Sequence, residues 1–269
     1  MTIQMSSTRT RRIKLALQIV STAVAVAGLG IGLMTLASAA GIWFGAWDFR
    51  RGFDLLRMAN AYGDVVAWVG LALTIGIIFA AKLWNTGSAL RLGALAATGT
   101  LVAGIAYAIP ESFRPPEGVN YPPIHDISTD LVSPPEFVAV LPLRADAPNT
   151  VVYGGSENMT PARLAELTRE AYPDLVPRTY AEPLNTVFAR ALDAVSALGW
   201  ELVAADERAG RIEATATTFW FRFKDDIVIT LANVGGETLV NARSVSRVGV
   251  GDVGANALRL RAFFELLGN

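Results

Sequence analysis

Residues 15–44 read LALQIVSTAVAVAGLGIGLMTLASAAGIWF, and none of these side chains carries a charge. The uncharged run continues to Trp47 and covers 33 residues between Lys14 and Asp48. A helix needs about 20 residues to cross the ~30 Å hydrocarbon core of a bilayer. This segment is therefore long enough to span a membrane, and it indicates that the chain is a membrane protein.

Two further uncharged runs follow, residues 65–81 and residues 92–109. They are at the short end for a span, but Trp68, Trp84 and Tyr107 stand where interfacial aromatic residues belong. We predict a transmembrane region over residues 13–109 whose three helices occupy about 15–44, 64–84 and 88–109.

The first run also has features of a cleaved secretory signal. Arg11 and Arg12 precede it, and the triplet 37–39 reads Ala-Ser-Ala. Its apolar core, residues 15–36, is 22 residues long, whereas a signal peptide has an apolar core of about 7–15 residues. An uncleaved anchor is therefore the preferred interpretation.

The composition supports a membrane protein and excludes several classes of function. Of the 269 residues, 52% are hydrophobic and only 17% are charged, where soluble domains carry about a quarter. Residues 1–109 have a net charge of +6 and residues 110–269 of −7, so a nucleic-acid partner is not expected. The absence of cysteine excludes disulfides, thiolate metal sites and cysteine nucleophiles.

The distribution of basic residues predicts the orientation. Six lysines and arginines flank the spans on the N-terminal side of the membrane and four on the other side. The positive-inside rule then makes residues 1–12 a cytoplasmic tail and places the C-terminal domain, residues 121–269, on the outer side of the membrane. The stretch 47–57 can lie as an amphipathic helix on the outer interface.

Small residues recur four positions apart within the spans, a spacing that lets helices approach closely. The pairs and triplet are Gly28/Gly32, Gly76/Ala80, Gly93/Ala97 and Thr100/Gly104/Ala108. Chance in a chain rich in glycine and alanine is the alternative explanation. The ionisable residues Asp64, Lys82 and Arg91 stand only at the ends of the predicted spans and none lies in their interior, which argues against a channel or pump.

A proline-rich segment separates the spans from the rest of the chain. Nine of the 13 prolines fall between Pro110 and Pro148, and residues 110–120 are predicted to form a semi-rigid tether. Helical or strand patterns follow; the predicted helices are 161–171, 184–198 and 253–267, and the predicted strands 151–153, 201–206, 211–221, 227–232 and 238–248. The fold class is a membrane-anchored α+β protein, in which three transmembrane helices precede a two-layer soluble domain with an antiparallel sheet and helices.

Many separate motifs in residues 115–269 resemble, in order, the domain-of-unknown-function family 1499. They are Tyr121–Asp130, the prolines at 134–135, Tyr172-Pro173-Asp174, Gly199-Trp200, Asp225-Asp226, Arg243–Gly249 and Asp252–Asn256. The resemblance implies a bacterial envelope domain, often joined to membrane helices, with no established activity. Thr230 and Asn241 depart from it, since an arginine and an aspartate are expected there; a polar site that used them would be weakened here.

His125, the single histidine, is followed by Asp126, and Asp130 lies nearby. A histidine oriented by a carboxylate is part of a nucleophilic triad, but no Gly-x-Ser-x-Gly elbow supplies the nucleophile. Hydrogen bonding of His125 and Asp126 to loop backbone is the preferred interpretation, ahead of catalysis and of ligand or metal binding. We predict no metal site and no cofactor, although carboxylates alone can bind calcium.

The stretch 243–247 reads Arg-Ser-Val-Ser-Arg and predicts a strand. Alternation places Arg243 and Arg247 on one face, about 13 Å apart, and Ser244 and Ser246 on the other. The two arginines can form structural ion pairs with Asp225, Asp226 or Asp252, or bind an extended anion or lipid head groups. The first interpretation is preferred.

Two other motifs are interpreted as structural. Residues 249–254 match Gly-x-Gly-x-x-Gly, but only 15 residues follow, too few for a dinucleotide-binding unit. Asp252 is then expected to cap the last helix, near Asn256. Phe219, Phe221 and Phe223 alternate and are predicted to face the core, leaving Trp220 as a candidate contact for membrane or partner.

These observations favour a non-catalytic accessory or scaffolding subunit of a larger inner-membrane complex, in contact with membrane lipids and a protein partner in the membrane or periplasm. Self-association into a homo-oligomer is left open. The first alternative is a periplasmic module that binds lipid head groups or another anionic envelope molecule through Arg243 and Arg247. The second is a periplasmic hydrolase that uses His125 and Asp126.

Overall fold

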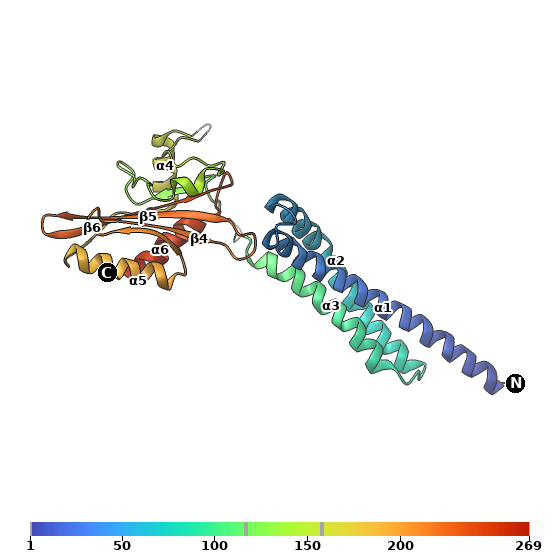
Figure 1. The fold of residues 1–269 in the computed structure, drawn as a ribbon. Coiled ribbons are helices and arrows are strands. Elements are labelled where there is room, and N and C mark those ends of the chain that lie inside the picture. Colours follow the sequence, from blue (N-terminus) through green and yellow to red (C-terminus); the bar gives the residue numbers. More distant parts are fainter. Residues whose placement is uncertain (1, 116–117, 157–158, 269) are drawn as a thin grey trace. The chain divides into compact units, whose positions relative to one another are not determined.

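The computed structural model describes residues 2–115, 118–156 and 159–268, with residues 2–7 described by their backbone alone. It divides into two compact units, Met1–Arg114 and Pro115–Asn269 (Figure 1). Residues 116 and 117, in the predicted tether, lie outside the described residues.

Three helices in the described part of the first unit are long and apolar enough to cross a membrane, as the sequence predicted. They are α1 (Thr2–Trp43), α2 (Phe49–Leu83) and α3 (Ala89–Ser112). The predicted interfacial stretch 47–57 is not a separate helix, because Asp48 accepts a hydrogen bond from the N–H of Arg51 and starts α2 directly. Helix α3 continues past the predicted end at residue 109, through Pro110 to Ser112.

Small residues let the three helices pack closely. A Cβ placed on Gly28 would lie 1.9 Å from the carbonyl oxygen of Gly99, so α1 and α3 touch backbone to backbone there. Ser21 of α1 also donates a hydrogen bond to the carbonyl of Leu92 in α3. At Gly76 and Gly104, by contrast, an added Cβ would meet nothing within 4 Å, so these two small residues are not used within the bundle.

The second unit is built on an antiparallel sheet. In its described residues six strands pair in the order β1-β6-β5-β4-β3, with β2 also on β6. Their bounds are β1 (Asp126–Ser128), β2 (Arg178–Tyr180), β3 (Glu201–Asp206), β4 (Arg211–Thr217), β5 (Lys224–Val234) and β6 (Glu237–Ser246). The sheet is open, and helices complete an α+β fold.

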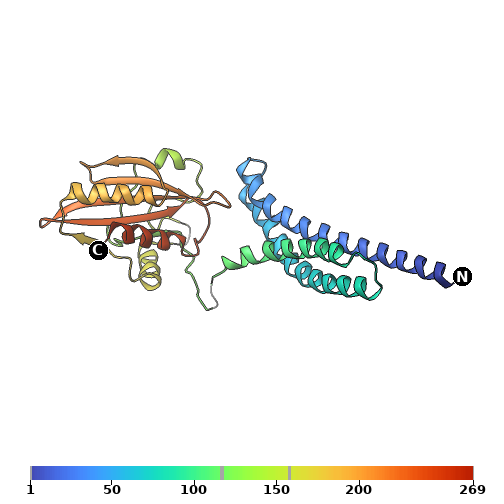
Figure 2. The same ribbon diagram turned by 90° about the horizontal axis from the view of Figure 1, so that it is seen from below.

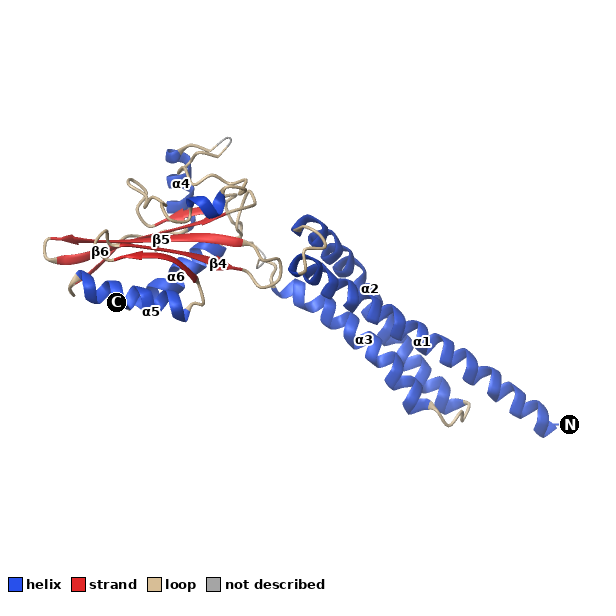
Figure 3. Ribbon diagram, in the orientation of Figure 1, coloured by secondary structure: helices blue, strands red, loops and turns tan. Residues whose placement is uncertain are grey.

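The two faces of the sheet are covered differently. Helices α5 (Leu184–Ala197) and α6 (Ala255–Leu267) pack on one face over Ile227, Ile229 and Val240 (Figure 2). The opposite face is covered by loop-rich chain, including the 3₁₀ helix η1 (Leu141–Arg144), over Val228 and Val245 (Figure 3). Helix α4 (Pro161–Ala171) lies beside β1.

Local sequence signals account for the helix starts. Thr160 accepts a hydrogen bond from the N–H of Arg163 and Pro161 is the first residue of α4. Asp252 was expected to be the N-cap of the last helix, but Gly254 holds that position. The carboxylate of Asp252 still accepts hydrogen bonds from the N–H groups of Gly254 and Asn256, both at 2.9 Å.

Three predictions about strands need correction. Residues 151–153 form no strand, because Val152 and Gly155 close a turn there. The strand predicted over 211–221 ends at Thr217, which pairs with Lys224, so the chain between them is a hairpin loop. Phe219, Phe221 and Phe223 therefore do not line the core; Phe219 is 70% exposed.

Candidate functional site

Arg243 of β6 is buried on the loop-covered face of the sheet, with 2% of its surface exposed. Its Nε and Nη2 donate to the two carboxylate oxygens of Asp126 at 2.8 and 2.7 Å. The remaining hydrogen bonds go to the carbonyls of Pro135 and Val151, at 3.0 and 2.7 Å. The guanidinium thus joins β6 to β1 and to two points of the loop-rich segment.

Two aromatic rings enclose this ion pair. The guanidinium carbon of Arg243 lies 5.3 Å from the ring centre of Phe137 and 5.4 Å from that of Tyr153. Burial, together with the nearby Asp126 carboxylate, raises the pKa of Tyr153 to about 12. Tyr153 is therefore neutral at ordinary pH and serves as a packing partner of the cation.

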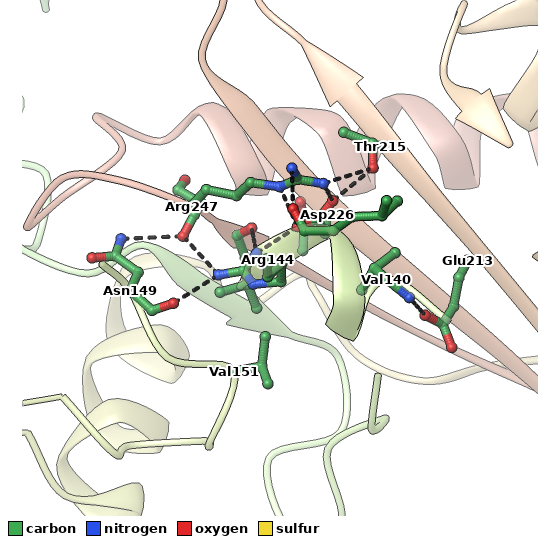
Figure 4. A network of polar contacts seen from close by, with 12 residues as sticks. Val140, Arg144, Asn149, Val151, Glu213, Thr215, Asp226 and Arg247 are labelled. Atoms are coloured by element: carbon green, nitrogen blue, oxygen red, sulfur yellow. Dashed lines mark hydrogen bonds and ion pairs between the residues drawn. The ribbon is translucent and has the colours of Figure 1, made fainter. Parts of the chain in front are cut away.

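A second network is centred on Asp226 of β5, whose side chain is fully buried (Figure 4). Arg247 donates to both carboxylate oxygens, at 2.9 and 2.8 Å. Arg144 of η1 donates at 2.6 Å, and the hydroxyl of Thr215 in β4 at 2.6 Å. Burial alone would raise the pKa of Asp226, but these hydrogen bonds hold it below its usual range.

The arginines of this network also bind backbone carbonyls. Arg247 donates to the carbonyl of Leu143 at 2.7 Å. Arg144 donates to the carbonyls of Asn149 and Ser246, at 3.0 and 3.3 Å. Both cations therefore hold the segment around η1 against the end of β6.

Glu213 of β4 is a third buried carboxylate on the same face, with no exposed surface. Its two oxygens accept hydrogen bonds from the N–H groups of Val138 and Val140, at 2.8 and 2.9 Å. Because this carboxylate is bound by main chain, it fastens the loop-rich segment at a point away from the arginines (Figure 4).

The opposite face carries a separate polar cluster where α6 begins. Ser244 donates to the Oδ1 of Asn256 at 2.5 Å, and the amide of Asn256 donates to the hydroxyl of Ser246 at 2.9 Å. Arg259 binds Asn256 at 2.5 Å and the carboxylate of Asp225 at 2.7 Å. This cluster fixes the start of α6 on β6 and β5.

His125 lies beside the start of β1, where its Nδ1 is 3.2 Å from the carbonyl oxygen of Val250. Its own carbonyl accepts hydrogen bonds from the N–H of Ser246 and the amide of Asn256. Both carboxylate oxygens of Asp126 are bound by Arg243. The side chain of His125 thus contacts loop backbone, whereas Asp126 binds a cation rather than backbone.

The other carboxylates have local roles. Asp130 accepts from the N–H groups of Val132 and Ser133, both at 2.9 Å, and so closes a turn. Burial raises the pKa of Asp252, although the N–H groups of Gly254 and Asn256 oppose that shift. Among the residues that the structure describes, no group of three or more histidine or carboxylate side chains is placed to hold a metal.

Trp220 is in the β4–β5 hairpin loop and is half-buried. The structure thus separates the candidate residues into two faces and one loop, and does not gather them into one pocket. Sequence reasoning missed Arg144, Glu213 and Arg259, whose partners are distant in the chain. The only local signal for any of them was that Glu213 stands between the apolar residues Ile212 and Ala214 in a predicted strand.

Thr230 and Asn241, the two departures from the expected pattern, are directly opposite each other on β5 and β6. An arginine and an aspartate at these positions would be cross-strand neighbours and could form an ion pair. Here Asn241 instead accepts a hydrogen bond from the hydroxyl of Thr129 at 3.3 Å. Both departures thus fall at one cross-strand position of the sheet.

Comparison with known proteins gives one match. The family model described as a protein of unknown function, DUF1499, matches residues 126–267, which include β1 to α6 and both polar faces. No curated protein and no solved structure matches the chain.

Proposed function

We propose that this chain, which belongs to the DUF1499 family of proteins of unknown function, is a non-catalytic accessory or scaffolding subunit of a larger bacterial inner-membrane complex. The observation that carries the proposal is the commitment of the buried charges to the fold. Arg243, Arg247 and Arg144 are each bound by a buried carboxylate and by backbone carbonyls. Such a domain presents a stiff surface to a partner rather than a reactive centre.

The membrane unit supports a role in assembly. In the apolar stretch of each candidate span, only 22% to 33% is buried within the structure. Most of the helical surface therefore faces outward. Gly76 and Gly104 are small residues outside the contacts of the bundle. Positions of this kind allow a further helix to approach closely.

The proposed location is the bacterial inner membrane, with the N-terminus in the cytoplasm and the α+β domain in the periplasm. Because the chain contains no cysteine, single cysteines can be introduced at Thr8 and at Arg208 without background. A membrane-impermeant maleimide applied to intact spheroplasts should label position 208 and leave position 8 unlabelled. Labelling of position 8 alone would reverse the proposed orientation.

Isolation of the tagged full-length chain from its native membranes in mild detergent tests the assembly proposal. We expect a second polypeptide in stoichiometric amount, identified by mass spectrometry. The double variant Gly76→Leu/Gly104→Leu should reduce its recovery if the partner packs on α2 and α3. Gly30→Leu on α1, where an added Cβ also meets nothing within 4 Å, is the control. Recovery of the chain by itself would oppose the proposal.

The geometry favours the two alternatives less. For Arg243 and Arg247 to bind an anion, their guanidinium groups would have to leave Asp126 and Asp226 in a buried environment. A hydrolase would need His125 oriented by Asp126, whose two oxygens are bound by Arg243. His125→Ala is therefore expected to leave both folding and partner recovery intact.

A further inference from the structure

The β4–β5 hairpin loop has an unusual composition for an exposed turn. Residues 218–224 read Thr-Phe-Trp-Phe-Arg-Phe-Lys. Thr218 closes the loop, because its N–H donates to the carbonyl of Phe223 at 2.8 Å and its hydroxyl accepts from the N–H of Phe223 at 2.9 Å. Phe219 is 70% exposed and Arg222 and Lys224 are exposed, so aromatic and cationic side chains share one small, well-formed tip.

This tip lies at the end of the sheet where the chain enters the domain from the spans. The N–H of Arg247, just after β6, donates to the carbonyl of Lys224 at the start of β5. The next residue back, Ser246, donates its N–H to the carbonyl of His125, the residue that precedes β1. Strand pairing therefore fixes the aromatic tip and the entry point of the chain at one end of the sheet.

Exposed apolar side chains extend the same end. Between β6 and α6, Val250 is 78% exposed and Val253 is 54% exposed. The N–H of Asp252 in this loop donates to the carbonyl of Ile124, and an added Cβ on Gly254 would clash with the ring of Tyr121. The loop thus packs directly on the entering chain.

The hairpin turns at the opposite end have no aromatic residue. The β3–β4 turn is Glu207-Arg208-Ala209-Gly210, and the β5–β6 turn contains Gly235 and Gly236. Among these hairpin loops the aromatic side chains are therefore confined to the one at the end of the sheet that is joined to the spans.

The covalent connection limits how far that end can be from the membrane. Residues 113–120 separate the last residue of α3 from Tyr121. Eight residues reach at most about 28 Å when fully extended. The opposite end can lie farther away by the length of β5, about 36 Å for its 11 residues.

We propose that the β4–β5 loop docks in the interfacial layer of the bilayer that the chain's own helices span. Phe219 and Trp220 enter the boundary between head groups and acyl chains, where amphipathic and aromatic rings are favoured. Arg222 and Lys224 bind phospholipid phosphates, most strongly where anionic lipids are present. The docked tip holds the tether end of the domain on the membrane surface.

Single-cysteine variants of the full-length chain in lipid nanodiscs test this proposal. An environment-sensitive fluorophore is placed at position 219 by Phe219→Cys, and at position 208 by Arg208→Cys as the matched control at the other end of the sheet. Nanodiscs of phosphatidylcholine and phosphatidylglycerol carry a nitroxide near the head groups. We expect strong quenching at position 219 and little at position 208; equal quenching at the two positions would overturn the proposal.

In a second experiment the fluorophore is attached outside the β4–β5 loop, so that the loop residues themselves can be varied. With the fluorophore at position 250 by Val250→Cys, the double variant Phe219→Ser/Trp220→Ser should lower quenching by the nitroxide lipid. Arg222→Asn, which keeps a residue tolerant of the positive φ of +56°, should lower the docked-to-undocked ratio roughly fivefold in anionic nanodiscs. If quenching at position 250 is the same in both variants as in the chain with the native loop, docking by this loop is contradicted. Protection of position 219 from aqueous iodide without quenching by the nitroxide lipid would assign the tip to a protein contact and overturn the proposal.

Discussion

Arg243 and Asp126, which lie 117 positions apart in the sequence, form an ion pair with two hydrogen bonds that joins β1, the first strand of the domain, to its neighbour β6. Both side chains are almost fully buried, at 2% and 7% exposure. A buried pair is costly to break, because the remaining charge is left without compensation.

Replacing Arg243 by lysine tests how much of this depends on the guanidinium geometry. Lysine keeps the charge but cannot bind both carboxylate oxygens and two carbonyls in one plane. Because buried carbonyl or carboxylate acceptors then lose their donor, we expect Arg243→Lys to lower the free energy of unfolding by about 1–3 kcal/mol. Urea unfolding of the full-length chain in detergent, followed by near-ultraviolet circular dichroism, measures this.

The matched control is Arg261→Lys. Arg261 also binds a carboxylate at two points, that of Asp174, at 2.6 Å each, but this pair is partly exposed. Its loss should cost about 1 kcal/mol or less. Equal costs for the two variants would refute a special role for the buried pair.

The lowered pKa of Asp226 predicts a loss of stability in acid. An aspartate whose pKa is lower in the folded than in the unfolded chain contributes stability above its unfolded pKa of about 3.9. That contribution is lost as the pH falls through the folded pKa. We therefore expect the free energy of unfolding to decrease on acidification below about pH 4.

Thr215→Val removes one donor to the carboxylate of Asp226 and tests this assignment. At neutral pH the variant should be less stable by about 1.5–3 kcal/mol, because a hydrogen bond to a charged acceptor is lost. The difference from the wild type should narrow as Asp226 becomes protonated. A difference that is constant from pH 7 to the acid limit would contradict the role given to Asp226.

Glu213 is predicted to fasten the loop-rich segment locally. Glu213→Gln replaces one acceptor oxygen by an NH₂ group that opposes the N–H of Val138 or Val140, at an expected cost of about 1–3 kcal/mol. Hydrogen exchange at the amides of Val138 and Val140 should be faster in this variant than in the wild type, under conditions in which the amides of the strands remain protected. Glu207→Gln, in an exposed turn, is the control and should leave exchange there unchanged.

A pair of glycines in α1 offers a test of the helix bundle. Gly28→Ala adds a Cβ at a point where the Gly99 backbone is 1.9 Å away, so the helices must separate, at an expected cost of about 1–3 kcal/mol. Gly30→Ala makes the same change where nothing lies within 4 Å. Thermal unfolding in detergent should show a lower midpoint for the first variant alone.

Local sequence patterns predicted most of the fold. The three spans follow from uncharged length, and α4, α5 and the cores of β3 to β6 follow from apolar periodicity and from turn residues. Strands β1 and β2 were missed because each has three residues and is defined only by pairing with β6. Residues 219–223 alternate like a strand, but the pairing of Thr217 with Lys224 turns them into a hairpin loop.

The site was predicted less completely, because its contacts are set by register. The sequence offered Asp225, Asp226 and Asp252 as partners for the two arginines. Alternation along β5 places Asp225 on the face of α6 and Asp226 on the face of Arg247. Arg144 lies in a segment whose path over the sheet no local pattern reveals, so its bond to Asp226 could not be foreseen.

The central claim, that the chain works as a subunit of a larger assembly, is tested most directly by native mass spectrometry of the tagged protein released from its own membranes. The account predicts a complex whose mass differs from every whole-number multiple of the chain mass, with or without bound lipid, and which releases a different polypeptide on activation. Only monomers or whole-number multiples of the chain itself, recovered under conditions that preserve other membrane complexes, would contradict it.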